Sequence, residues 1–251
     1  MKQFGIIGLG RFGRRMVDEL LKADVELLLL DKNPEVIETF KNSVAAAYVA
    51  DALNEETIRH IIPKDIDAVI VDAVDNMDVS ILVTHYLRKM GVREIIAVAG
   101  TDQHGEIMQA VGATRVIFPN KEAALRIAPT LVSSALFNYF PIAENMALAE
   151  LKPPQKFVGL SLIESDMRNV LGITVIAVRR TEDEEFAFVP GTYRLNADDT
   201  LLVVAPDEVI GKLSHVRLSG GASGATGAKR SSDSNTQKRR SFLQHLFRRG
   251  R

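Results

Sequence analysis

Residues 2–31 read KQFGIIGLGRFGRRMVDELLKADVELLLLD and decide the fold class. An apolar run leads into the pattern G-x-G-x-x-G, formed by Gly8, Gly10 and Gly13, and a second apolar run ends at Asp31 after a stretch of helical period. A strand, a glycine-rich turn, a helix and a second strand in this order form a βαβ unit. In such units the glycines allow a tight turn and bring the backbone close to a pyrophosphate at the helix N-terminus. The stretch therefore predicts a dinucleotide-binding fold.

The rest of the first 120 residues continues the alternation of apolar runs and helical patterns. Candidate strands lie at 2–8, 25–31, 44–50, 67–73, 94–99 and 115–118. Runs such as GIIG, ELLLL and AVIV are almost continuously apolar, which is typical of strands that helices cover on both faces. The predicted fold class is α/β, with a doubly wound parallel sheet that forms a Rossmann-like nucleotide-binding lobe over residues 1–120.

A smaller unit follows this sheet. A helical pattern over 121–139 predicts a crossover helix within residues 121–143. Further on, Ser161 and Glu164 have the spacing of a capping box at the start of a short helix. Candidate strands at 173–178, 186–189 and 201–205 precede a closing helix from about 206. We expect these elements to form a small α+β C-terminal lobe over residues 144–217.

The composition excludes several classes of chemistry. The 251 residues include no Cys, which removes disulfide frameworks, thiol nucleophiles and Cys-ligated zinc. Hydrophobic residues make up 46% and charged residues 25%, as in ordinary globular proteins. Since no 18-residue apolar run occurs, we expect neither a signal peptide nor a membrane span, and a cytoplasmic protein.

Charge is distributed unevenly along the chain. Residues 219–251 hold eight basic side chains and one acid, so within the total of −1 the remaining chain carries a net charge of −8. A body of that sign repels the phosphate backbone, and we expect no nucleic acid partner. The Gly/Ser/Ala-rich start of the tail 218–251 predicts disorder. The segment 241–247, SFLQHLF, predicts a short basic amphipathic helix that contacts an anionic membrane surface; a merely solubilising tail is the alternative.

Candidate ligand-binding residues follow the predicted strands, because ligands of parallel α/β sheets bind outside the carboxyl ends of the strands. Asp31 ends the second strand and can accept hydrogen bonds from ribose hydroxyls. Asp51 and Asp72 end the third and fourth strands and border the same crevice. Arg11 lies in the glycine loop, where its guanidinium suits a nucleotide with more negative charge than NAD, such as ATP. The alternative for Arg11 is a solvent-exposed arginine without a ligand.

Residues for catalysis are not found in the sequence. An oxidoreductase needs an acid or base beside the nicotinamide. The five His are scattered, and neither His-Glu-x-x-His nor Gly-x-Ser-x-Gly occurs. His104, in a segment expected to be a loop, is the His best placed for a function. We predict a nucleotide sensor that is not an enzyme, with no catalytic residue and no metal site; an NAD-dependent oxidoreductase is the alternative.

The chain resembles the regulatory subunits of Trk/Ktr potassium uptake systems, which are built from RCK domains. In the first lobe the resemblance rests on GLGRFG at 8–13, DKN at 31–33, DA at 51–52, GA at 112–113 and Pro119. In the second lobe it rests on GLSL at 159–162, Arg168, GI at 172–173, PG at 190–191 and DDTL at 198–201. The matching motifs span about 1–217 in order.

The resemblance implies a ring of eight subunits, assembled from dimers, on the cytoplasmic face of a potassium-translocating membrane subunit. ATP and ADP, or NADH and NAD, would bind the first lobe and favour different ring shapes, which gates potassium transport. The predicted cofactor-binding residues are Gly8, Gly10, Arg11, Phe12, Gly13, Asp31, Lys32, Asn33, Asp51, Ala52 and Asp72. Both ligand pairs are compatible with this set.

Two further expectations come from the family. Relatives often have His-Pro-Glu where this chain has Phe118-Pro119-Asn120, and the Glu supports a cation between paired nucleotides. The neutral Asn120 therefore puts cation dependence in question. In some relatives the second lobe binds cyclic di-AMP, and Arg168, Asn169 and Ile173 lie in the corresponding stretch.

Overall fold

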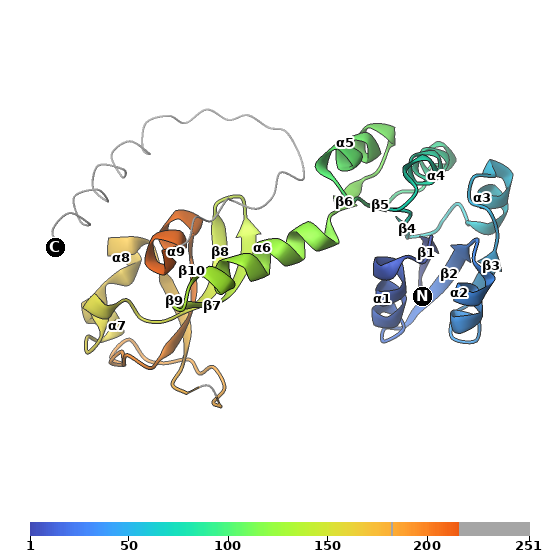
Figure 1. Cartoon of the computed structure of the whole chain (residues 1–251). Helices are drawn as coiled ribbons and strands as arrows, with labels where there is room; N and C mark the ends of the chain where they lie inside the picture. The colour runs from blue at the N-terminus through green and yellow to red at the C-terminus, as the bar shows by residue number, and fades with distance from the viewer. Residues whose placement is uncertain (182, 216–251) are drawn as a thin grey trace.

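The computed structural model describes residues 1–181 and 183–215. Figure 1 shows two lobes joined through one helix, α6. The predictions for the basic tail, including its amphipathic segment, lie outside the described residues.

The first lobe is a six-stranded sheet with the order β3-β2-β1-β4-β5-β6, and every neighbouring pair is parallel. Its strands are β1 (Lys2–Ile7), β2 (Val25–Asp31), β3 (Ala46–Val49), β4 (Ala68–Val71), β5 (Ile95–Val98) and β6 (Arg115–Ile117). The helices between them are α1 (Arg11–Leu20), α2 (Pro34–Phe40), α3 (Glu55–Ile61), α4 (Met77–Met90) and α5 (Asp102–Val111). The doubly wound α/β fold class predicted from the sequence is confirmed.

Helices cover both faces of this sheet because successive strand residues point to opposite sides. Ile6 packs with Val17 of α1 and Val36 of α2, whereas its neighbour Ile7 packs with Ile58 of α3 and Val83 of α4. All four residues of β4 are buried. The continuous apolar runs of the sequence thus correspond to strands with two buried faces.

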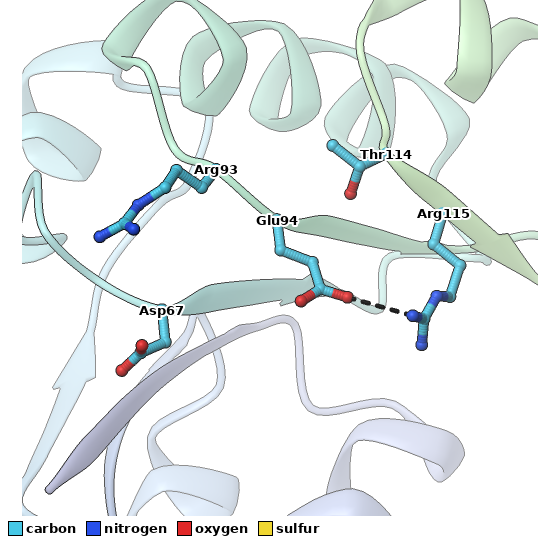
Figure 2. Close-up of a pocket in the computed structure, with 5 residues that line it drawn as sticks. All are labelled: Asp67, Arg93, Glu94, Thr114 and Arg115. Atoms are coloured by element: carbon cyan, nitrogen blue, oxygen red, sulfur yellow. Dashed lines mark ion pairs between the residues drawn. The ribbon is translucent and has the colours of Figure 1, made fainter.

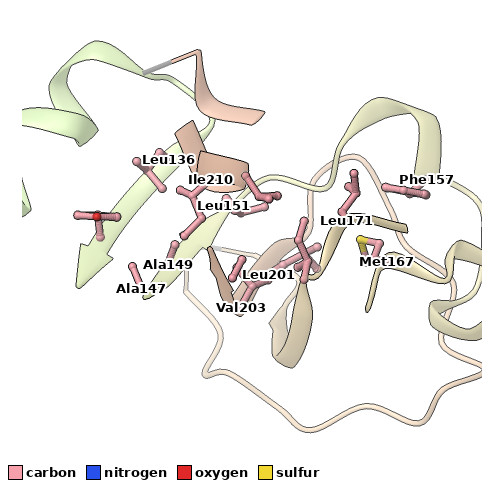
Figure 3. Close-up of a cluster of buried hydrophobic side chains, with 14 of the residues drawn as sticks. Leu136, Ala147, Ala149, Leu151, Phe157, Met167, Leu171, Leu201, Val203 and Ile210 are labelled. Carbon is pink, nitrogen blue, oxygen red and sulfur yellow. The ribbon is translucent and has the colours of Figure 1, made fainter. Parts of the chain in front are cut away.

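The second lobe is an antiparallel sheet with the order β7-β8-β10-β9. Its elements are β7 (Leu136–Ala143), β8 (Met146–Leu151), α7 (Leu162–Ser165), α8 (Met167–Leu171), β9 (Thr174–Arg179), β10 (Thr200–Pro206) and α9 (Asp207–Ser214). Figure 3 shows its core, in which Leu151 and Leu201 of the sheet lie near Leu171 of α8 and Ile210 of α9. The capping box of Ser161 and Glu164 is present at the start of α7.

The prediction of a helix over 121–139 was wrong at its C-terminal end. Helix α6 spans Pro119–Val132, and the chain then forms strand β7, which pairs with β8. The segment LFNYFPIA of β7 is rich in aromatic residues, which favour strands, and pairing with β8 buries Leu136 and Tyr139. The C-terminal sheet therefore begins before the boundary expected at 144.

The predicted strand over 186–189 was also wrong. Only an isolated bridge between Val178 and Ala187 forms there. Phe188 is 86% exposed, so its side chain gains no burial from strand pairing, and Pro190 has no N–H to donate to a ladder.

Candidate functional site: a nucleotide cavity at the glycine loop

A cavity of about 1030 Å³ lies at the carboxyl ends of the parallel strands. Ten of the eleven residues predicted to bind a cofactor line it: Gly8, Gly10, Arg11, Phe12, Asp31, Lys32, Asn33, Asp51, Ala52 and Asp72. Gly13 is not among the lining residues and is buried within α1. The structure thus brings together residues from the ends of β1, β2, β3 and β4 in one hollow.

Sequence reasoning missed the lining residues at the carboxyl ends of β4 and β5 and at the start of α4, which are Val74, Asn76, Val79, Val98, Ala99 and Gly100. Pro119 and Asn120 at the start of α6 also line the cavity, and Asn120 is the position that the family resemblance linked to a cation between nucleotides. The available signal was positional, since the carboxyl end of every parallel strand reaches the same edge of the sheet.

The glycine loop packs directly against Asp72. Gly8 has φ +81°, and a Cβ built on it would lie 2.4 Å from the Asp72 carbonyl oxygen. A Cβ on Gly10 would lie 2.6 Å from Asp72 Oδ2, and one on Gly13 would lie 3.1 Å from the same atom. Gly10 was expected to admit a pyrophosphate. In this structure its missing side chain leaves room for a carboxylate of the protein itself.

Asp72 was predicted to contact a cofactor, but its carboxylate also bonds to the protein. Asp72 Oδ2 accepts a 2.6 Å hydrogen bond from the Gly13 backbone N–H, and the residue is 6% exposed. Gly10, the N-cap residue of α1, has no side chain to cap the helix, so Asp72 supplies the acceptor from β4. Burial raises the pKa of Asp72, while the hydrogen bonds from the Gly13 and Gly10 backbone act in the opposite direction.

Asp31 is fixed at the rim of the cavity by two backbone donors. Its Oδ2 accepts from Leu9 N–H at 2.6 Å, and its Oδ1 accepts from Asn33 N–H at 2.8 Å. A carboxylate has about four acceptor positions, so both oxygens retain capacity for hydroxyl donors. Asn33 in turn caps α2 through its side chain, which accepts from Glu35 N–H. The second strand, its carboxylate and the next helix are therefore held as one rigid rim.

Cationic side chains lie at the end of the cavity next to the glycine loop. Arg14 donates from Nε to the Leu9 carbonyl oxygen at 2.8 Å and braces the loop. Arg15 lies 3.6 Å from Asp18. Arg11 is exposed and lines the cavity at the first position of α1, and Lys32 lines it from beyond β2.

Asp51 and Ala52 lie after β3, at the side of the cavity away from the loop. Asp51 is exposed and its Oδ1 accepts from Leu53 N–H at 2.9 Å, which closes a turn. Ala52 is 8% exposed and belongs to the core of the first lobe, so it presents an apolar wall.

Other candidates from the sequence lie away from this cavity. His104 is 2% exposed and its Nε2 lies 2.9 Å from Ser80 Oγ, so the ring joins α5 to α4, and burial lowers its pKa. In the second lobe Ile173 is 1% exposed, and Asn169 donates to Asp166 at 2.7 Å. These contacts give His104 and Ile173 structural roles.

A second hollow, of about 420 Å³, lies at the opposite end of the sheet (Figure 2). Asp67, Arg93, Glu94, Thr114 and Arg115 line it. Glu94 and Arg115 form an ion pair at 3.4 Å, and Asp67 accepts from the Gln3 backbone N–H. The hollow is open, mixed in charge and placed at the amino ends of the strands, which is the wrong edge for a ligand of a parallel sheet.

Within 1–181 and 183–215, no group of three or more His, Asp or Glu is arranged to hold a metal ion. In the same ranges, no helix has the length and hydropathy needed to cross a membrane.

Comparisons with known proteins agree with this architecture. Residues 4–119 match the TrkA-N domain and residues 146–216 match the TrkA-C domain. The chain is 29% identical over 203 residues to Ktr system potassium uptake protein C of Bacillus subtilis (strain 168), covering 81% of this chain and 91% of that protein. It is 27% identical over 214 residues to Ktr system potassium uptake protein A of Vibrio alginolyticus, covering 84% and 96%.

Solved structures show the same fold. The RCK domain of GsuK aligns with a TM-score of 0.59 at 18% identity over 88% of this chain, which spans about half of that protein (48%). The GsuK channel bound to NAD aligns with the same TM-score and identity over 40% of its chain. With both domains in order, this chain belongs to the family of Trk/Ktr-type potassium uptake regulatory subunits.

The contact between Gly10 and Asp72 yields a test of what the glycine loop requires. Gly10 has extended backbone angles that alanine can adopt, so Gly10→Ala should destabilise the protein through the Asp72 carboxylate alone. Asp72→Ala should remove that clash, and a double-mutant cycle on the free energy of unfolding should give a favourable coupling of about 0.5–3 kcal/mol.

Gly8→Ala is the matched control. Its clash involves the backbone oxygen of Asp72 and its φ is positive, so Asp72→Ala should give no relief there. Additive effects of Gly10→Ala and Asp72→Ala would contradict this account of the loop.

Proposed function

We propose that this protein is a nucleotide-sensing regulatory subunit that gates potassium uptake and has no enzymatic activity. The observation that carries the proposal is the cavity above the N-terminus of α1. The first turn of a helix has N–H groups without intrahelical partners. Asp72 accepts that of Gly13, and the next two belong to Arg11 and Phe12, which both line the cavity. The fixed Asp31 carboxylate lies beside them.

The ligand is an adenine nucleotide of the ATP/ADP or NAD(H) type. Its phosphates bind at the N-terminus of α1, where the N–H groups and the helix dipole favour negative charge. Asp31 accepts hydrogen bonds from the ribose hydroxyls, and the adenine lies toward Asp51 and Ala52. Lys32 and Arg11 add positive charge at the rim. The NAD-bound state of the structurally similar GsuK channel supports the NAD(H) type.

Helix α6 is the physical link between nucleotide and response. Its first residues, Pro119 and Asn120, line the cavity, and it ends three residues before β7 of the second lobe. A ligand that contacts the start of α6 differently in two states can shift the population of lobe arrangements by its difference in affinity for them. A tenfold difference per site corresponds to about 1.4 kcal/mol, and several sites in a symmetric assembly add their effects.

The partners follow from the family. The protein assembles as dimers into a ring of eight, which binds the potassium-translocating membrane subunit at the inner face of the cell membrane. Apolar side chains on α6 support assembly, since Ile127, Leu131 and Val132 are 56%, 81% and 72% exposed. Contiguous exposed apolar surface of this kind marks sites of protein association.

Calorimetry and small-angle scattering test the proposal together. We expect ATP, ADP, NAD or NADH to bind the purified protein, and the scattering profile of the assembled protein to differ between at least two of these ligands. NADH absorbance should stay constant over hours in the presence of candidate substrates. Catalytic loss of NADH absorbance by a small, unassembled protein would support the oxidoreductase instead.

Arg11 provides a sharper prediction about ligand charge. The side chain is exposed and lines the cavity beside the glycine loop, so it should interact most with the third phosphate of ATP. Arg11→Ala should narrow the ratio of ATP to ADP affinity and leave ADP binding almost unchanged by calorimetry. Arg15→Ala is the control, because Arg15 pairs with Asp18. Equal losses for both nucleotides would show that Arg11 contacts only the diphosphate or supports the loop.

We also propose that the basic segment 218–251 binds anionic lipid. It lies outside the described residues, and its charge alone supports the proposal, since each basic residue near such a surface contributes on the order of 1 kcal/mol. Truncation after Leu218 should abolish sedimentation with phosphatidylserine vesicles at low salt and leave nucleotide affinity intact. Equal sedimentation of full-length and truncated protein would contradict the proposal.

A further inference from the structure

We propose that Asp72 determines nucleotide specificity: its buried carboxylate under the glycine loop selects against ligands in proportion to the negative charge of their phosphates. The site would therefore favour a dinucleotide with a two-phosphate bridge over a nucleoside triphosphate. This inference rests on the proposed function, because it names the ligand class of the same cavity.

The first step is the position of the charge. Asp72 directly follows β4, and its own N–H donates to the Ile7 carbonyl oxygen at 2.8 Å, which places the residue under the loop. Its carboxylate bonds to the first turn of α1 through Gly13 N–H at 2.6 Å. Phosphates that bind to the Arg11 and Phe12 N–H groups bind to that same turn. Phosphates bound in this way therefore lie close to the Asp72 carboxylate.

The second step is competition for positive potential. A free helix N-terminus carries about half a positive charge, which normally attracts the phosphate. In this protein the negatively charged Asp72 carboxylate already accepts the hydrogen bond of Gly13 N–H, one of the three N–H groups of the first turn. Because Asp72 is 6% exposed, solvent and salt screen it much less than a surface charge. Each added phosphate charge thus meets a larger penalty than it would over an ordinary glycine loop.

Charged groups of both signs surround Asp72. Burial is the main cause of its raised pKa, and Asp75 beyond β4 and Asp31 at the end of β2 raise that pKa further. On α1 the cations are Arg14, which is bonded to the Leu9 carbonyl oxygen, Arg15, which lies 3.6 Å from Asp18, and the exposed Arg11. Lys32 follows β2. The lining contributed by β5 and by the start of α6, from Val98 to Gly100 and at Pro119 and Asn120, is uncharged. Among the charged groups that line the cavity, Asp72 is the one that is buried, so its charge is the least screened by solvent.

This arrangement couples ligand binding to protons. A bound anion disfavours the ionised form of Asp72 and raises its pKa further above the already raised value of the free protein. Between those two pKa values the complex holds more protons than the free protein. Binding then takes up protons, and affinity falls as the pH rises through that window. The coupling should be stronger for ATP than for NAD, because ATP has more phosphate charge.

The main experiment compares Asp72→Asn with the wild-type full-length protein by calorimetry with ATP and NAD. Asparagine retains a carbonyl oxygen for Gly13 N–H and removes the charge. We expect the ratio of ATP to NAD affinity to rise roughly three- to tenfold, as for one or two charges at a separation of several ångströms in a polar site. Asp75→Asn is the matched control, since Asp75 lines the same cavity but is exposed, and its effect should be clearly smaller.

Wild-type protein provides a second measurement that needs no variant. Binding enthalpies of ATP in buffers with different ionisation enthalpies report proton uptake, which should fall toward zero in Asp72→Asn. An unchanged affinity ratio in a folded Asp72→Asn protein, or ATP binding without proton uptake by wild-type protein across the acidic range, would overturn the role of Asp72. If wild-type protein binds neither nucleotide, the proposed function itself fails, and the inference fails with it.

Discussion

The hydrogen bond from Gly13 N–H to the Asp72 carboxylate is the contact on which the candidate site depends. It joins the first turn of α1 to the end of β4 across 59 positions of sequence. Gly8, Gly10 and Gly13 all approach Asp72 so closely that a Cβ on any of them would lie within about 3.1 Å of it. The glycine pattern therefore meets an internal packing requirement before any ligand arrives.

This contact divides the N–H groups of the loop between the protein and a ligand. Leu9 donates to Asp31, and the backbone of Gly13 and Gly10 donates to Asp72. Under the proposed function, the N–H groups of Arg11 and Phe12 bind phosphate. The two carboxylates make the loop rigid, so a ligand meets donors that are already oriented and loses less entropy on binding. The same two charges lower the positive potential of the site. Preorganisation and anion affinity therefore oppose one another here.

Much of the fold could be predicted because its signals are local. Short stretches of sequence indicate the same fold independently: the apolar runs predict β1, β2 and β4, and the glycine turn predicts the start of α1. The end of α6 could not be predicted in this way. Residues 136–143 become a strand because they pair with β8, and that pairing buries Leu136 and Tyr139. Tertiary pairing decided between two local conformations that the helical period alone did not separate.

The cavity residues were accessible to sequence reasoning for the same reason, since each follows a recognisable strand. The contacts that each of these residues makes were harder to predict from the sequence. Asp31 carries a carboxylate toward the rim from the strand beside the loop, as expected, and retains acceptor capacity for a hydroxyl. Asp72 directly follows β4, the strand on the other side of β1, and has an identical side chain, yet its carboxylate lies under the loop and is almost fully buried. The difference arises from the missing Cβ of Gly10, which opens the space that Asp72 Oδ2 occupies. Two aspartates at the ends of the strands on either side of β1 therefore differ in burial and in hydrogen-bond partners because of the packing of a single glycine.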